Sequence, residues 1–176
     1  MSNINLYDFI DKIQDFPKKG ILFRDISPLL ENKDAFKLLI LKMINEIKKY
    51  QIDLIAGIDS RGFLFSTILA HQLDVGSIMI RKPNKLPGHV IEKNYELEYG
   101  TSSLSIQKKR NLYGKNLLII DDLLATGGTL KCAEELISDA GGKVVLTIVA
   151  IELNALKGRK KIKSELLSQK ENFVKG

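Results

Sequence analysis

The segment Leu117–Leu130, which reads LLIIDDLLATGGTL, places two adjacent carboxylates and a turn of small residues after a run of aliphatic side chains. The carboxylates are Asp121 and Asp122, and the turn consists of Ala125, Thr126, Gly127, Gly128 and Thr129. Small residues let backbone N–H groups close around a phosphate, while the threonine hydroxyls and the dipole of a following helix attract the same anion. We therefore predict a phosphate-binding turn. It lacks the lysine of a Walker A loop, which argues against a nucleoside triphosphatase.

The two carboxylates would repel a phosphate placed directly on them. We expect them instead to accept hydrogen bonds from sugar hydroxyls or to help hold a hydrated magnesium ion beside the phosphate. Taken by itself, the turn fits an ordinary strand-to-helix junction equally well, because such junctions use the same residue types.

A second candidate loop lies in Gly57–Phe63, GIDSRGF. It puts Ser60, Arg61 and Gly62 at the predicted end of a strand and start of a helix, where a guanidinium group and free backbone N–H groups suit a pyrophosphate. Arg61 could also pair on the surface, as most arginines do, but its neighbours favour binding.

A third basic segment follows the next strand, with Arg81, Lys82 and Lys85 ahead of about a dozen irregular residues. We interpret it as a mobile lid over the predicted site. A basic loop without function is the alternative. His89 is interpreted as a solvated loop residue.

The elements that must position these groups follow from hydrophobic periodicity. Helices are predicted at 34–48, 61–73 and 129–140, and apolar strands at 52–58, 77–80, 116–120 and 143–151. Alternating helices and apolar strands predict an α/β fold with a mainly parallel sheet. Because ligands bind beyond the carboxyl ends of parallel strands, the ends at Ile58, Ile80 and Ile120 are the places where we expect the site.

Length and composition exclude other classes. A chain of 176 residues with 44% hydrophobic and 27% charged residues predicts one globular domain. It has no apolar run long enough to span a bilayer, so we expect no integral membrane protein. The single cysteine, Cys132, and the polar amino terminus predict a reducing, cytoplasmic setting. Cys132 itself is interpreted as a buried small side chain.

The net charge of +6 is concentrated at the carboxyl end. From Lys157 onward there are seven Lys or Arg residues and two Glu, which accounts for +5 of the total. Such a segment can bind nucleic acid, but no helix-turn-helix or RNA-binding signature accompanies it, so a solvated basic tail is the preferred interpretation.

The string of a hydrophobic run, two acids and ATGGT resembles the phosphoribosyl-pyrophosphate signature of type I phosphoribosyltransferases. Phe16–Leu30 (FPKKGILFRDISPLL), Gly57–Phe63 and Ile80–Gly100 (IRKPNKLPGHVIEKNYELEYG) narrow the resemblance. Together the four strings resemble the adenine phosphoribosyltransferase family from about Asp15 to about Arg159. The pyrophosphate loop carries Asp59-Ser60 where many members have Glu-Ala.

This resemblance implies a parallel twisted sheet flanked by helices in a single domain over residues 1–176. Residues 1–30 would form a hood over the base, and about 82–95 a flexible lid. The implied reaction is the Mg²⁺-dependent transfer of the phosphoribosyl group from phosphoribosyl pyrophosphate to adenine, giving AMP and pyrophosphate in purine salvage. A homodimer is also implied, and nucleic acid is not an expected partner.

The resemblance also implies roles for individual residues. Asp121 and Asp122 would face the ribose hydroxyls, and the turn at 125–129 would hold the ribose phosphate. The magnesium ion would be held mainly by substrate oxygens and water, with both aspartates assisting. The remaining groups would be Ser60, Arg61, Arg81, Lys82 and Lys85 on pyrophosphate, and Leu22, Phe23 and Arg24 on adenine. The Asp59–Ser60 peptide is expected to be cis.

Glu98 is the predicted catalytic residue. In YELEYG the alternation places Glu96 and Glu98 on one face of a strand. The resemblance sets Glu98 near the imidazole ring of adenine, either to accept a proton or to position the ring.

Two other functions stay open. One is a regulator of the same fold that senses phosphoribosyl pyrophosphate and binds nucleic acid through the basic carboxyl end. The other is an enzyme for hypoxanthine or guanine.

Overall fold

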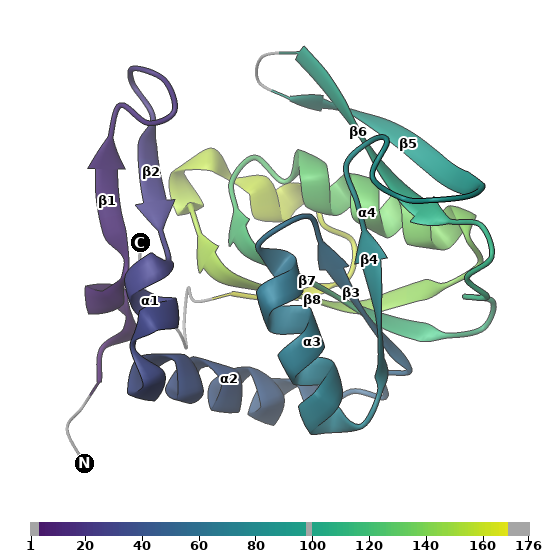
Figure 1. Ribbon diagram of the computed structural model, residues 1–176, viewed down its shortest axis with the longest axis horizontal. Helices are drawn as coiled ribbons and strands as arrows, with labels where there is room; N and C mark the ends of the chain where they lie inside the picture. Colours follow the sequence, from purple (N-terminus) through teal and green to yellow (C-terminus); the bar gives the residue numbers. More distant parts are fainter. Residues whose placement is uncertain (1–3, 98–99, 169–176) are drawn as a thin grey trace.

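A five-stranded parallel sheet forms the centre of the computed structural model, which describes residues 4–97 and 100–168 (Figure 1). The strand order is β4-β3-β7-β8-β9. The strands are β3 (Leu54–Ile58), β4 (Gly76–Ile80), β7 (Asn116–Leu124), β8 (Lys143–Glu152) and β9 (Glu165–Leu167). All neighbouring strands run parallel, which confirms the predicted α/β fold.

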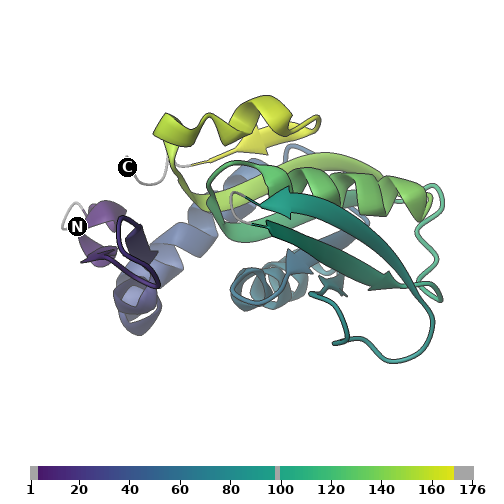
Figure 2. The same cartoon turned by 90° about the horizontal axis from the view of Figure 1, so that it is seen from above.

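Two hydrophobic cores lie on opposite faces of this sheet. Along β7, Leu118 and Ile120 join the core under α2 (Lys33–Ile47) and α3 (Gly62–Leu73). Leu117 and Ile119 join the core under α4 (Gly128–Asp139), which contains the buried Cys132. Because successive side chains of a strand point to opposite faces, one apolar run serves both cores. Figure 2 shows α4 on one side of the sheet.

The amino-terminal part stands beside the sheet (Figure 1). It consists of η1 (Leu6–Phe9), the antiparallel pair β1 (Asp11–Gln14) and β2 (Leu22–Asp25), and α1 (Ser27–Glu31). Leu6, Ile26 and Leu29 are buried in the core under α2, so this part is anchored by apolar contacts. Asn32 accepts hydrogen bonds from the N–H groups of residues 34 and 35 and thereby caps α2.

An antiparallel hairpin of β5 (Val90–Leu97) and β6 (Gly100–Gln107) lies over α4. Arg81 bridges to Ser105 of this hairpin, which connects the end of β4 to it. The irregular backbone predicted as a lid covers residues 82–89, and the remainder of that range belongs to β5.

The strand predicted at 116–120 continues to Leu124, so the two aspartates lie inside β7 rather than after it. The pairing of β3 with β7 ends at Ile120, whereas β8 pairs with β7 as far as Leu124. The end of β7 therefore projects beyond β3, and the residues that follow β3, Arg61 and Gly62, lie against Asp121 and Asp122 there.

The carboxyl-terminal segment is not a solvated tail over its described length. After β8 the chain forms η2 (Asn154–Leu156), η3 (Gly158–Lys161) and β9. Gly158 and Leu166 are buried, which corrects the preferred sequence interpretation for residues up to 168. Within the described ranges, no helix is both long and apolar enough to cross a membrane.

Candidate active site

A cleft of about 480 Å³ opens at the carboxyl ends of β3 and β7. Its lining comes from the loop after β3, the turn after β7 and the β5–β6 hairpin. Most of the predicted site residues line it, namely Ser60, Arg61, Lys82, Asp121, Asp122, Ala125, Thr126, Gly127, Gly128 and Thr129. The strand ends identified from the sequence thus meet at one cleft, as expected for an open parallel sheet.

Asp121 and Asp122 stand on the projecting end of β7. The N–H of Asp122 donates to Oδ1 of Asp121 at 2.9 Å. Burial, followed by repulsion from Asp122, raises the pKa of Asp121 well above its usual value. Burial also raises the pKa of Asp122, although Arg61 pulls it down. The cleft therefore holds two carboxyl groups in an environment that disfavours their ionised forms.

Arg61 forms an ion pair with Asp122, with 2.8 Å between Nη2 and Oδ2. Its guanidinium carbon also lies 5.1 Å from the centre of the Phe23 ring. Nη1 donates a long hydrogen bond of 3.4 Å to the carbonyl oxygen of Arg24. A residue predicted to bind pyrophosphate thus links Asp122 in the cleft to the amino-terminal part.

The turn from Ala125 to Thr129 leads directly into α4. Gly127 has a φ of 80°, a left-handed conformation that favours glycine, and it precedes the first helical residue, Gly128. A β-carbon at Gly128 would lie 3.1 Å from the carbonyl oxygen of Glu96, so the hairpin closes tightly on the turn. The backbone N–H groups of a helix amino terminus are accordingly placed at the cleft.

The loop after β3 brings its backbone close to β7. The peptide between Asp59 and Ser60 is cis, as predicted. A β-carbon at Gly62 would lie 2.6 Å from the carbonyl oxygen of Ile120, so α3 can begin here only with glycine. This close approach sets Ser60 and Arg61 opposite the two aspartates.

Asp59 is 8% exposed, and its carboxylate contacts the basic residues that follow β4. Its Oδ2 accepts from Nε of Arg81 at 3.1 Å and from the N–H of Lys82 at 3.4 Å, and Nζ of Lys85 lies 3.6 Å away. Burial acts to raise the pKa of Asp59, but the hydrogen bonds from Arg81 and Lys82 and the positive charges of Lys85 and Arg81 together lower that pKa. Arg81 and Lys85 therefore stand at the edge of the cleft, next to residues that line it.

The predicted base-binding residues lie in β2. Phe23 contacts Phe16 edge to face, with 5.1 Å between ring centres, and it is only partly buried. Leu22 is 41% exposed. These side chains are therefore not core residues, and Arg61 connects them to the cleft.

Glu98, the predicted catalytic residue, lies outside the described residues. Sequence reasoning missed the hairpin residues Tyr95, Ser102 and Leu104, which line the cleft. It also gave no role to Asp59. The alternation in residues 95–99 indicated a strand, but only its pairing with β6 turns Tyr95 toward the turn.

A family model and curated relatives identify proteins that this chain resembles over most of its length. A family model described as phosphoribosyl transferase domain matches residues 27–176. The adenine phosphoribosyltransferase of Halothermothrix orenii is 51% identical over 159 residues, which are 90% of this chain and 94% of that protein. That of Brachyspira hyodysenteriae is 48% identical over the same shares of the two chains.

Solved structures of similar proteins share this fold. The adenine phosphoribosyltransferase of Thermoanaerobacter pseudethanolicus has a TM-score of 0.90 and 44% identity, covering 93% of this chain and 95% of its own. The Saccharomyces cerevisiae enzyme, solved with an imino-altritol bisphosphate and adenine, has a TM-score of 0.88 and 36% identity over the same shares.

Proposed function

Because this chain belongs to the adenine phosphoribosyltransferase family, we propose that it transfers the phosphoribosyl group from phosphoribosyl pyrophosphate to adenine. The products are AMP and pyrophosphate, which makes it a purine-salvage enzyme. One observation carries the proposal. In a chain 51% identical to such an enzyme, the aspartate pair, the small-residue turn and the Ser60-Arg61 loop line a single cleft.

We assign the sugar to the end of β7. The turn at 125–129 binds the ribose phosphate through backbone N–H groups and threonine hydroxyls, and Asp121 and Asp122 accept hydrogen bonds from the ribose hydroxyls. Ser60, Arg61, Arg81, Lys82 and Lys85 bind the pyrophosphate. The Asp122–Arg61 ion pair must open for both partners to take up these roles, since Arg61 then exchanges a carboxylate for a phosphate oxygen.

The amino-terminal part supplies the base site. Phe23 stacks on adenine, and backbone groups of Leu22 and Arg24 recognise its amino edge. The Arg61 guanidinium, now close to Phe23, would leave this ring when it moves to the pyrophosphate. Residues 82–89, the irregular part of the predicted lid, close over the reacting centre and exclude water.

The residues of the cleft fit a magnesium ion that arrives bound to the substrate. Among the described residues no group of three or more His, Cys, Asp or Glu could hold a metal ion. Mg²⁺ characteristically takes one or two protein carboxylates together with substrate phosphates and water, and Asp121 and Asp122 provide such carboxylates. When bound, the ion neutralises charge on the leaving pyrophosphate.

A base panel tests the proposed reaction. The purified protein is incubated with phosphoribosyl pyrophosphate, Mg²⁺ and each of five nucleobases, and nucleotide products are separated and quantified. We expect AMP from adenine and far lower catalytic efficiency with hypoxanthine and guanine. Comparable efficiency with an oxopurine would overturn the base assignment, and activity after thorough chelation would contradict the metal requirement.

Glu98→Gln separates the two roles proposed for that residue. A loss mainly in kcat supports proton transfer, whereas a loss mainly in adenine affinity supports positioning of the ring.

A homodimer forms part of the proposal. β4 is an edge strand of the described sheet, with Met79 49% exposed on it, and Leu64 on the adjoining α3 is 44% exposed. A second copy covering this edge would bury both side chains. We expect a dimer by light scattering and a monomer for Met79→Lys. A wild-type monomer would refute the dimer without affecting the reaction.

The regulator of the same fold is disfavoured because residues 157–168 pack on the sheet instead of forming a free basic arm. A cytoplasmic location remains a prediction from the sequence. Duplex DNA and RNA binding with a steep salt dependence would revive the regulator.

A further inference from the structure

We propose that Gly158 is a positioning residue for the phosphate-binding turn, and that residues 157–168, here called the backing segment, hold that turn in its binding conformation. The inference rests on the proposed function, because it assumes that the turn at 125–129 binds the ribose phosphate. Gly158 does not face the cleft and supplies no group to it.

Backbone contact between Gly158 and the turn is unusually close. A β-carbon on Gly127 would lie 2.5 Å from the carbonyl oxygen of Gly158 and 3.2 Å from its Cα. In the opposite direction, a β-carbon on Gly158 would overlap the carbonyl oxygen of Ala125 and lie 2.8 Å from the nitrogen of Gly127. Two glycines therefore allow the backing segment and the turn to pack backbone against backbone.

This packing matters because the groups that would bind phosphate are backbone groups of the same turn. A shift of the Ala125 carbonyl or the Gly127 nitrogen moves the neighbouring N–H donors with it. Donor positions in such a site must hold to a fraction of an ångström, and a misplacement of about 1 Å can cost about 100-fold in rate.

Arg159 fixes the backing segment to the sheet immediately after Gly158. Its Nε and Nη2 lie 3.1 and 2.6 Å from the two carboxylate oxygens of Glu152, the last residue of β8. Nη1 donates to the carbonyl oxygen of Leu166 in β9 at 2.7 Å. Glu152 is 4% exposed whereas the Arg159 side chain is 38% exposed, so the carboxylate is buried and the two-pronged pairing holds it in a defined geometry.

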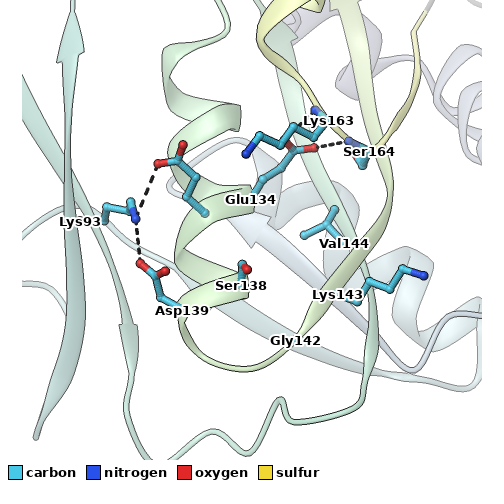
Figure 3. Close-up of a pocket in the computed structure, with 10 residues that line it drawn as sticks. Lys93, Glu134, Ser138, Asp139, Gly142, Lys143, Val144, Lys163 and Ser164 are labelled. Atoms are coloured by element: carbon cyan, nitrogen blue, oxygen red, sulfur yellow. Dashed lines mark hydrogen bonds and ion pairs between the residues drawn. The ribbon is translucent and has the colours of Figure 1, made fainter.

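Glu134 fixes the same segment from the other side. Figure 3 shows its carboxylate reaching from α4 toward Lys163 and Ser164. It accepts the N–H of Lys163 at 2.9 Å and the N–H of Ser164 at 2.8 Å. The hydroxyls of Ser164 and Thr147 also lie 2.8 Å apart. Since α4 begins at Gly128 of the turn, the helix that starts at the phosphate site is tied to the segment that supports it.

The test is Gly158→Ala, whose β-carbon presses on the backbone of the turn and also lies 2.8 Å from Cδ1 of Leu124, the last residue of β7. No positive φ makes the substitution strained by itself. We expect KM for phosphoribosyl pyrophosphate to rise about 10- to 100-fold, and the Kd for AMP to rise similarly, because both ligands use the turn. KM for adenine should stay within about threefold, since the base site is on β2.

Gly142→Ala is the matched control. A β-carbon there would lie 2.7 Å from Leu117 Cδ1 and 2.9 Å from Ile137 Cγ2, so it crowds the core beyond the far end of α4. We expect a lower melting temperature without a change in either KM. An equal rise in the phosphoribosyl pyrophosphate KM in both variants would overturn the proposal, because general destabilisation would then explain it.

Arg159→Lys carries the test if Gly158→Ala does not fold. Lysine keeps the charge opposite Glu152 but loses the two-pronged geometry and the bond to Leu166. We expect at least about a threefold rise in the phosphoribosyl pyrophosphate KM with an unchanged adenine KM. An unchanged phosphoribosyl pyrophosphate KM in a folded variant at either position refutes the positioning role. Absence of AMP formation by the wild-type protein would instead refute the proposed function.

Discussion

Replacing Asp121 by Asn is expected to make the protein more stable and less active at the same time. Burial and the neighbouring Asp122 raise the pKa of Asp121, so the folded state holds its ionised form at a cost. Asparagine has nearly the same shape and keeps an Oδ1 acceptor for the N–H of Asp122, which donates at 2.9 Å. The substitution therefore removes the charge and leaves the local hydrogen bond.

The size of the gain follows from linkage. Each unit by which folding raises a carboxyl pKa costs the ionised folded state about 1.4 kcal/mol. We expect Asp121→Asn to recover at least about 1 kcal/mol at neutral pH, which raises the melting temperature by about 2–4 °C in a chain of this size. Loss of a charged hydrogen bond to the ribose, worth about 1.5–3 kcal/mol, should lower kcat/KM for phosphoribosyl pyrophosphate by about 10- to 150-fold.

The pH dependence of the stability difference tests separately whether ionised Asp121 destabilises the folded protein. A carboxyl whose pKa is higher in the folded state is destabilising when ionised, and the penalty disappears as pH falls through that pKa. The difference in melting temperature between Asp121→Asn and the wild type should therefore shrink as pH falls from neutral toward the ordinary pKa of an aspartate. Thermal unfolding by circular dichroism across this range measures it.

Asp122→Asn serves as the comparison. Burial also raises the pKa of Asp122, but Arg61, 2.8 Å away, lowers it, so this substitution should stabilise the protein less than Asp121→Asn does. A melting temperature for Asp121→Asn at or below that of the wild type at neutral pH, or a pH-independent difference, would show that the carboxyl is not held against its own ionisation.

Three further predictions concern other parts of the molecule. Phe23→Leu should raise KM for adenine about tenfold by removing a stacking surface and leave KM for phosphoribosyl pyrophosphate unchanged, as steady-state kinetics will show; equal effects on both would exclude stacking. Gly57→Ala places a β-carbon 2.8 Å from Cβ of Ser66, so the free energy of unfolding should fall by about 1–3 kcal/mol in a urea titration, and an unchanged midpoint would contradict the packing. Burial raises the pKa of Cys132 to about 11, so its thiol should react with a disulfide reagent at neutral pH only after denaturant is added; rapid reaction of the native protein would contradict its burial.

Apolar runs and small-residue turns made the sheet and most of the site predictable. The four aliphatic residues before Asp121 bury both faces of β7, which is a property of side-chain type alone. The turn at 125–129 and the loop at Ser60 follow strand ends, and the topology of a parallel sheet brings such ends together.

What the sequence did not reveal depends on partners distant in the chain. β7 extends to Leu124 because β8 pairs with it there, and no local pattern encodes that partner. Arg61 pairs with Asp122 only because α3 starts against β7 at Gly62. Gly158 contacts the phosphate turn through its backbone, and a glycine in a lysine-rich stretch carries no periodic signal of such a contact.

Because β7 projects past β3, substitutions that affect the proposed sugar site and substitutions that affect the proposed base site fall on different parts of the fold. The aspartates that we propose to bind the sugar lie on β7, the central strand of the sheet, so the sheet fixes their positions. The residues that we propose for the nucleobase lie on the peripheral ribbon β1–β2, which is anchored by buried apolar residues on either side of it, Leu6, Ile10, Ile26 and Leu29. Substitutions in that ribbon can therefore change the preference for one nucleobase over another, while the proposed binding site for phosphoribosyl pyrophosphate stays the same.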